Sequence, residues 1–174
     1  MMRMDGMWSR YILLGLFLAA CGPMGGCGPI KSDVGMRLVF DTYDKVAIWG
    51  SLLRSDEEFF IPLWMISFPK QTLVERRDLE SIMGEQDILP DRLDNATRAE
   101  IRRILGVKAL IYPSFSTSAQ FSIKVIDTET GEIVASVLVR EVSLGPFASD
   151  SMKHSAFIKK AIHSLRDKLD EIKN

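Results

Sequence analysis

Cysteine and histidine, the side chains most often used as nucleophiles and metal ligands, are scarce in this chain of 174 residues. The chain holds two of each: Cys21 and Cys27 near its start, and His154 and His163 near its end. The histidines share one predicted helix, where a separation of nine residues makes about two and a half turns, so their rings face opposite sides. We therefore expect two solvated helix residues and no metal site held by this pair.

Cys21 has a sequence context that favours chemistry at its thiol. Arg3 and Arg10 give a positive charge to the segment before the apolar run Tyr11–Ala20. This arrangement is typical of a signal peptide, and the run is too short to span a bilayer. The run leads into Leu18–Cys21 (LAAC), which resembles the lipobox of bacterial lipoproteins. That resemblance implies that the thiol receives a diacylglycerol and that the amine freed by cleavage is acylated, which gives a stable membrane anchor.

Two other interpretations of this region stay open. The first is an ordinary signal peptide that leaves a cysteine near the cleavage point. The second places the lipid on Cys27, although Met24–Cys27 (MGGC) lacks the aliphatic residue and lies beyond the apolar run. By resemblance to enterobacterial sorting, Gly22 after Cys21 indicates the outer membrane. We predict a signal peptide at residues 1–20 and attachment through lipid to the periplasmic face of the outer membrane.

The next stretch separates this anchor from the folded part. Gly22–Gly35 is rich in glycine and proline and shows no periodicity, so we predict a lipidated tether over residues 21–35. Fully extended, it would reach about 50 Å. Residues 36–174 then form a single periplasmic α/β domain, long enough to build a core without disulfides or metals.

Neither charge nor motifs indicate a catalyst or a nucleic-acid binder. Basic and acidic residues number 22 and 23 and are interspersed, which argues against a nucleic-acid surface. The chain contains no nucleophile elbow, phosphate-binding loop or zinc-protease motif. Asp127–Glu132 (DTETGE) resembles a calcium loop, but its glycine comes one position early and the closing glutamate is missing, so we interpret it as a hairpin turn. We expect a non-catalytic protein without cofactor, metal or small-molecule substrate.

Apolar periodicity predicts an α+β domain in which helices pack on a mixed sheet of about five strands, in the order β-α-β-α-α-β-β-β-α. Strands are expected at residues 45–49, 71–75, 107–112, 121–126 and 132–142, and the last two form a hairpin. Helices are expected within 51–67, where Pro62 interrupts, and at 78–83, 97–105 and 151–173. Thr97 and Glu100 have capping-box spacing, and Gly106 suits a left-handed helix end.

Three stretches resemble, in this order, segments of the curli-secretion-channel family (CsgG-type lipoproteins). Leu73–Gln86 (LVERRDLESIMGEQ) resembles its strand and following helix, Ala99–Tyr112 (AEIRRILGVKALIY) its helix–glycine–strand segment, and Ile123–Val134 (IKVIDTETGEIV) its hairpin. The resemblance covers roughly residues 45–172. Channel members carry extra hairpins that insert into the outer membrane, and this chain has no room for them. What the resemblance implies for this chain is therefore the periplasmic α/β domain.

Two functions follow from this resemblance. The first is a non-catalytic subunit that self-associates or scaffolds an envelope assembly such as an export apparatus. The second is a regulatory lipoprotein that docks on a peptidoglycan synthase, as LpoB-type relatives do. A tether of about 50 Å is short for reaching an inner-membrane enzyme from the outer membrane, which favours the first function.

Two clusters of side chains are candidate contacts for such partners. Phe59–Phe68 (FFIPLWMISF) has no polar stripe, so one helix face cannot bury all of its large side chains, although core packing is the other interpretation. Residues 75–80 form a mixed charge cluster, which is either a partner contact or a solvated corner, since exposed ion pairs contribute little. The candidate contact residues are Phe59, Phe60, Trp64, Glu75, Arg76 and Arg77.

Overall fold

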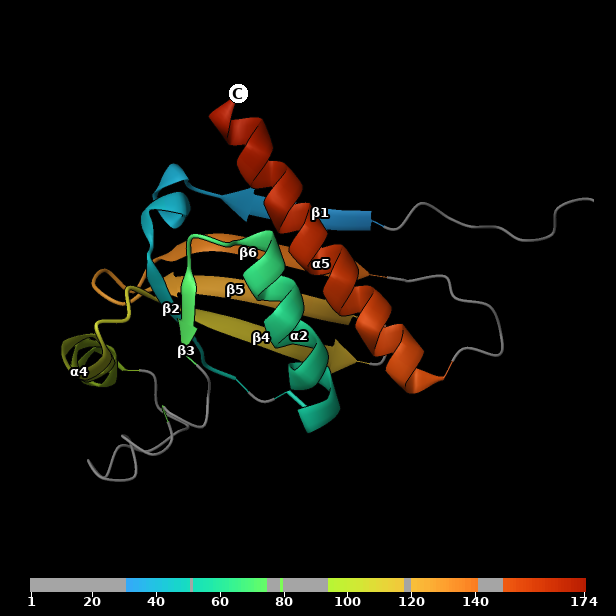
Figure 1. Ribbon diagram of the computed structural model, residues 1–174, viewed down its shortest axis with the longest axis horizontal. Coiled ribbons are helices and arrows are strands. Elements are labelled where there is room, and N and C mark those ends of the chain that lie inside the picture. Colours follow the sequence, from blue (N-terminus) through green and yellow to red (C-terminus); the bar gives the residue numbers. More distant parts are fainter. Residues whose placement is uncertain (1–30, 51, 75–78, 80–93, 118–119, 141–148) are drawn as a thin grey trace, which may run out of the picture.

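A six-stranded mixed sheet forms the centre of the domain (Figure 1). The computed structural model describes residues 31–50, 52–74, 79, 94–117, 120–140 and 149–174. The strand order is β1-β6-β5-β4-β2-β3; neighbours from β1 to β4 are antiparallel, whereas β4, β2 and β3 run parallel. The predicted mixed sheet with packed helices is confirmed. Its elements are β1 (Lys31–Met36), η1 (Leu38–Thr42), β2 (Lys45–Ile48), α2 (Arg54–Ser67), β3 (Thr72–Val74), α4 (Asn95–Leu105), β4 (Ala109–Thr117), β5 (Gln120–Asp127), β6 (Ile133–Arg140) and α5 (Asp150–Lys173).

The folded domain begins earlier than predicted, at the first strand. β1 pairs antiparallel with β6, from Lys31 opposite Arg140 to Met36 opposite Ala135. Residues 31–35, predicted as the end of the tether, therefore lie in an edge strand, and the tether prediction is wrong for them. They join the sheet because β6 offers a row of backbone donors and acceptors, which even a segment without apolar alternation can satisfy.

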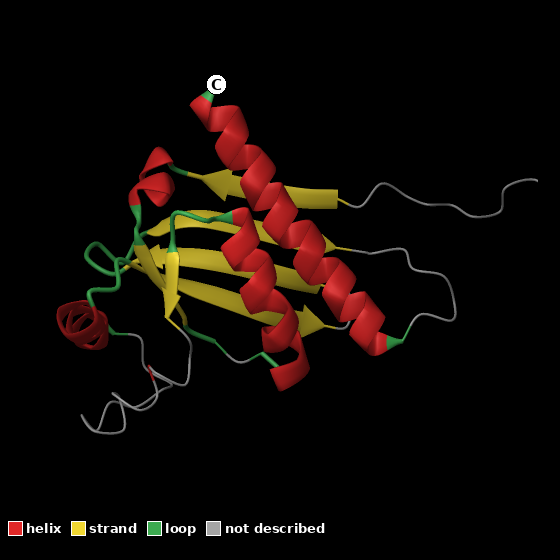
Figure 2. Ribbon diagram, in the orientation of Figure 1, coloured by secondary structure: helices red, strands yellow, loops and turns green. Residues whose placement is uncertain are grey.

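The helices α2 and α5 lie side by side on one face of the sheet (Figure 2). They run parallel, because Asp56 near the start of α2 contacts His154 near the start of α5, while Arg166 of α5 donates to the carbonyl of Ser67 at the end of α2. Alternate side chains of the central strands point into this layer and form the main core with both helices. Within the described residues, no helix is long and apolar enough to cross a bilayer.

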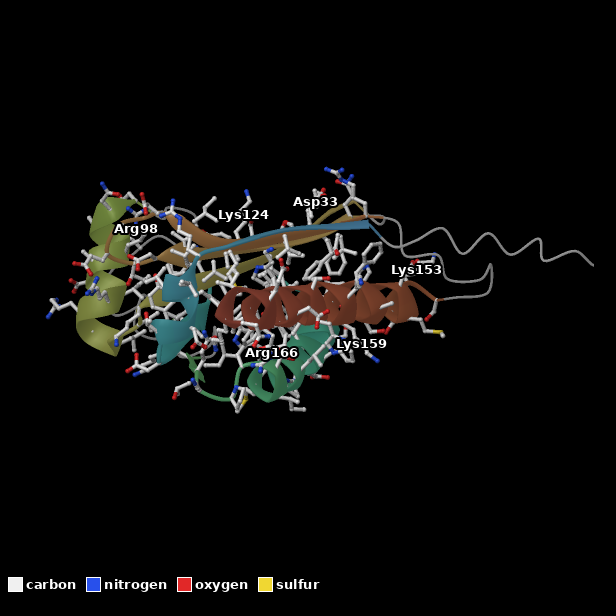
Figure 3. All side chains as sticks on the ribbon, turned by 90° about the horizontal axis from the view of Figure 1, so that it is seen from above. Asp33, Arg98, Lys124, Lys153, Lys159 and Arg166 are labelled. Atoms are coloured by element: carbon white, nitrogen blue, oxygen red, sulfur yellow. The ribbon has the colours of Figure 1, made fainter. Side chains whose placement is uncertain are left out.

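The opposite face of the sheet is covered only in part. There α4 packs beside β2 and β4, and Ile101 is buried with Ala47 and Leu110 in a smaller second core. Lys124 of β5 and Asp33 of β1 project from the same face, on the side away from α5 (Figure 3). Both side chains are exposed, so no described element covers this half of the face.

The helix α2 continues through Pro62, contrary to the prediction that this proline interrupts it. Pro62 is exposed, so the proline removes one intrahelical hydrogen bond without placing its ring in the core. Phe60 and Trp64 on either side of it are fully buried, and the burial of two large aromatic rings offsets that loss. The helix predicted at 78–83 lies outside the described residues, except for Leu79, which is buried.

Local chemistry sets both ends of α4. Asp94 caps its start, where the Asp94 Oδ1 accepts a hydrogen bond of 2.8 Å from the backbone N–H of Thr97. The predicted capping box is therefore wrong by about one turn: Thr97 is buried within the helix, and Glu100 pairs with Arg103 instead. Gly106 follows the last turn with φ at +64°, which confirms the predicted left-handed helix end.

We expect Gly106→Val to lower the free energy of unfolding by more than about 1 kcal/mol. A Cβ at this position would meet nothing within 4 Å, so the loss comes from the positive φ, which a β-branched residue tolerates poorly. Gly106→Asn is the matched control, because asparagine adopts this conformation more readily. Chemical denaturation compares the two variants, and an unchanged midpoint for Gly106→Val would contradict this helix end.

One carboxylate organises the turn between β5 and β6. Oδ1 of Asp127 accepts hydrogen bonds from the backbone N–H groups of Glu129 at 2.8 Å and Thr130 at 2.7 Å. Oδ2 of Asp127 accepts a hydrogen bond of 2.6 Å from the hydroxyl of Tyr43. Gly131 closes the turn at a φ of +75°, and a register irregularity follows in the ladder. The predicted hairpin is confirmed.

Candidate interaction surface

The structure describes only part of the predicted site. Four predicted site residues lie outside the described residues, and their roles stay predictions: Cys21, Glu75, Arg76 and Arg77. The other three predicted contact residues, Phe59, Phe60 and Trp64, lie on α2. The structure separates these three, because Phe60 and Trp64 are buried whereas Phe59 is exposed.

Trp64 is part of the core rather than a contact residue. Its ring is fully buried and stacks on Phe60, with ring centroids 5.5 Å apart. Phe68 and Phe40 pack against other sides of the same indole at 4.6 and 6.3 Å. The indole N–H donates a hydrogen bond of 3.2 Å to Oε1 of the buried Gln71. The prediction that Trp64 and Phe60 are contact residues is therefore wrong, because both rings are buried in the core.

The spacing of these residues contains a signal that could have found the buried side. Asp56, Phe60, Trp64 and Phe68 recur every four residues, so they form one line along α2. All four are buried, although Asp56 is charged. The line is hard to recognise in the sequence because apolar residues lie on all sides of the helix, and no polar stripe marks the outer side.

The other side of α2 carries apolar side chains that the described chain leaves exposed. Ile66 is 77% exposed, Met65 53% and Phe59 37%, and Pro62 is exposed between them. We call Phe59, Pro62, Met65 and Ile66 the α2 outer face. Scattered exposed apolar residues are ordinary, but four on one side of a single helix form a patch of the kind that marks interaction sites.

A shallow hollow extends this patch towards α5. It measures about 440 Å³ and lies where the end of α2 meets α5, with Ile66, Pro69, His163, Arg166 and Asp167 among the residues that line it. Both charged and apolar side chains therefore surround the end of the α2 outer face. A dry centre with a polar rim is the usual anatomy of a protein contact surface.

The histidines have different environments, and one prediction about them is wrong. His163 is exposed, as expected. His154 is half-buried: its Nδ1 lies 3.0 Å from Oδ2 of the buried Asp56, and its ring stacks on Phe115 at 4.1 Å. This contact joins the starts of α5 and α2, so His154 has a structural partner that its sequence position did not reveal.

A second hollow, of about 630 Å³, lies between α4 and the β5–β6 turn and is lined by three arginines. Arg102 pairs with Glu129 at 2.6 Å and Arg103 pairs with Glu100, so two of the three charges are balanced locally. Arg98 packs over the turn and donates a hydrogen bond to Asn95. In the described part of the chain, no three Cys, His, Asp or Glu side chains gather as metal ligands. The non-catalytic role stays a prediction.

Comparison with solved structures places this fold among known bacterial proteins. It is similar to the PelC dodecamer from Paraburkholderia phytofirmans, with a TM-score of 0.50 and 12% identity over 79% of this chain and 97% of that one. A variant PelC dodecamer from the same organism gives the same score and identity over 79% and 98% of the two chains. The lipoprotein GNA1162 from Neisseria meningitidis matches with a TM-score of 0.42 and 11% identity, over 71% and 98%.

At such identities, the likeness to PelC shows a shared fold. No family model matches the chain, and no curated protein matches it. Membership of the curli-secretion-channel family therefore stays a prediction.

Proposed function

We propose that this chain is a non-catalytic, lipid-anchored subunit of an assembly in the bacterial cell envelope. Its fold is shared with a protein that was solved as a dodecamer, and its sequence begins with a predicted signal peptide and lipidated cysteine. The predicted place of attachment is the periplasmic face of the outer membrane. The observation that carries the proposal is the α2 outer face, whose apolar side chains the described part of the chain leaves exposed.

The energetic argument concerns Ile66 and Met65. Burying a large aliphatic side chain stabilises a contact by roughly 1.5–3 kcal/mol, so two such residues with Phe59 can anchor an interface. Among the described residues of a monomer, no contact covers this apolar surface. Self-association removes it from water and needs no partner other than a second copy.

We expect Ile66→Ser to raise the dissociation constant of self-association at least ten-fold, because the variant loses a central apolar anchor. Ile133→Ser is the matched control, since Ile133 is 48% exposed but lies at the β5–β6 turn, away from α2. The full chain is purified in detergent from membranes, and light scattering after size-exclusion chromatography gives the mass of each form. A wild-type chain that stays monomeric at every concentration would contradict the proposal.

The anchor has a separate test. Cys21→Ser should abolish incorporation of labelled palmitate in growing cells, because its hydroxyl cannot receive the thioether-linked lipid. The domain should stay folded, since β1 begins ten residues later. Cys27→Ser is the control and should label normally. Label in the Cys21→Ser protein would contradict the assignment of the lipid to Cys21. Label that is lost in Cys27→Ser would show that Cys27 carries the lipid instead.

A further inference from the structure

The uncovered half of the sheet is a second surface available to a partner. Side chains alternate along a strand, so the neighbours of the buried Phe121, Ile123 and Val137 point to the opposite face. We call these outward residues the open sheet face. Its members on β1, β5 and β6 are Asp33, Gly35, Ser122, Lys124, Ser136 and Leu138, and they line a shallow hollow of about 500 Å³.

Small side chains produce this hollow. Gly35 and Ser136 lie opposite each other on β1 and β6, and a Cβ added to Gly35 would come 3.4 Å from the Ser136 hydroxyl. Ser122 is the outward residue of β5 opposite Leu138. The strands therefore present a recess with one apolar wall, Leu138, into which larger side chains can reach. A surface of this shape suits protruding aliphatic residues.

The two unpartnered surfaces lie on opposite sides of the molecule. Figure 3 shows α2 on one side of the sheet, and Lys124 and Asp33 projecting on the other side. The α2 outer face lies opposite the side of the helix that is buried in the core, so it faces away from the sheet, while the open sheet face points the other way. Two different surfaces on opposite sides can pair only between copies arranged head to tail. Such heterologous contacts build closed rings when the rotation between copies closes, and open filaments when it does not.

We propose that the α2 outer face of one copy docks on the open sheet face of the next copy. This inference rests on the proposed function, because it specifies how the copies meet. Ile66 and Met65 protrude and the sheet face is recessed, so the shapes are complementary. Each surface carries exposed charges of both signs, Asp33 and Lys124 on the sheet face and Arg54 and Glu58 in the first half of α2, so opposite charges can pair across the contact.

A head-to-tail contact also explains both surfaces with one interface. A two-fold contact between two α2 outer faces would bury the apolar helix residues but would leave the recess on the sheet unused and would end at a dimer. In the head-to-tail arrangement, every copy contributes its helix face to one neighbour and its sheet face to the other.

Mixing two variants tests this arrangement. Ser136→Arg fills the recess, and Ile66→Asp places a charge on the α2 outer face. Each contact between copies needs one intact sheet face and one intact helix face, so neither variant can self-associate when it is alone. We expect both to be monomers when full-length chains are purified separately in detergent. When they are mixed, the intact helix face of the first meets the intact sheet face of the second, and a heterodimer of one copy each should form and grow no further.

Two further measurements keep the test decisive. Circular dichroism and thermal unfolding check that each variant is folded. Lys124→Glu, at an exposed position, replaces Ser136→Arg if that variant does not fold, and should raise the dissociation constant at least five-fold. A wild-type chain that does not self-associate would contradict the proposed function. Wild-type assembly that Ser136→Arg and Lys124→Glu leave unchanged would overturn only the head-to-tail contact and would indicate pairing through α2 alone.

Discussion

Trp64→Ala should lower the free energy of unfolding by about 3–5 kcal/mol, the range for removing a large aromatic side chain from a core. Trp64 has no exposed surface, and the rings of Phe40, Phe60 and Phe68 surround it. Truncation leaves a cavity between these rings. It also removes the indole N–H, so the buried Gln71 loses a hydrogen-bond partner. Chemical denaturation followed by circular dichroism measures the loss.

Met65→Ala is the matched control for this variant. Met65 is the next residue of α2 and is 53% exposed, so its truncation should change the free energy of unfolding by less than about 0.5 kcal/mol when both proteins are measured as dissociated monomers. Trp64→Phe should fall between the two, because a smaller ring leaves a smaller cavity, and it provides a folded variant if Trp64→Ala does not fold. Equal losses for Trp64→Ala and Met65→Ala would contradict the orientation of α2.

Asp127→Ala should lower the free energy of unfolding by about 2–3 kcal/mol, because several donors lose one acceptor at once. Tyr43 is 4% exposed, and its hydroxyl would be left in the interior without the Asp127 carboxylate. The backbone N–H groups of Glu129 and Thr130 would lose their partner in the turn. Glu129→Ala is the control, since its ion pair with Arg102 is exposed and should contribute less than about 1 kcal/mol.

The same carboxylate predicts a dependence on pH. Burial alone would raise the pKa of Asp127, but the hydrogen bonds from Tyr43 and from the N–H groups of Thr130 and Glu129 outweigh it and lower that pKa. Burial, together with the neighbouring carboxylate, raises the pKa of Tyr43, so its hydroxyl stays protonated and keeps donating.

Because the pKa of Asp127 is lower in the folded state, its stabilising effect is complete above the unfolded pKa of about 4. The effect is lost as pH falls through the folded pKa. Denaturation of the wild type and of Asp127→Asn from pH 7 to pH 2 should therefore show a difference that shrinks in acid. A difference that stays constant over this range would contradict the lowered pKa.

Features that depend on neighbours in the chain were predictable from the sequence. Gly106 ends α4 and Gly131 closes the β5–β6 turn because only a residue without a Cβ adopts those positive φ values readily. The alternation of Phe121, Ile123 and Val125 placed one face of β5 in the core correctly, because side chains of a strand point to opposite sides in turn. These signals act over a few residues and need no tertiary context.

Other features required partners that are distant in the sequence. β1 forms through pairing with β6, about a hundred residues later, and carries no apolar alternation of its own. His154 is half-buried because Asp56, from another helix, lies against it. Pro62 stays within α2 because packing on both sides of it outweighs one missing hydrogen bond.

The amino-acid sequence predicts a mixed α+β domain behind a signal peptide and a lipidated Cys21. It also shows that Phe59–Phe68 has more large apolar side chains than one helix face can bury. Which of these side chains are buried depends on the packed fold: Trp64 lies in the core, and Ile66 is exposed. The physical reason is that burial is a property of the whole packed layer, since hydrophobic attraction has no direction of its own. In a helix without a polar stripe, the surrounding sheet and α5 determine which side faces inward.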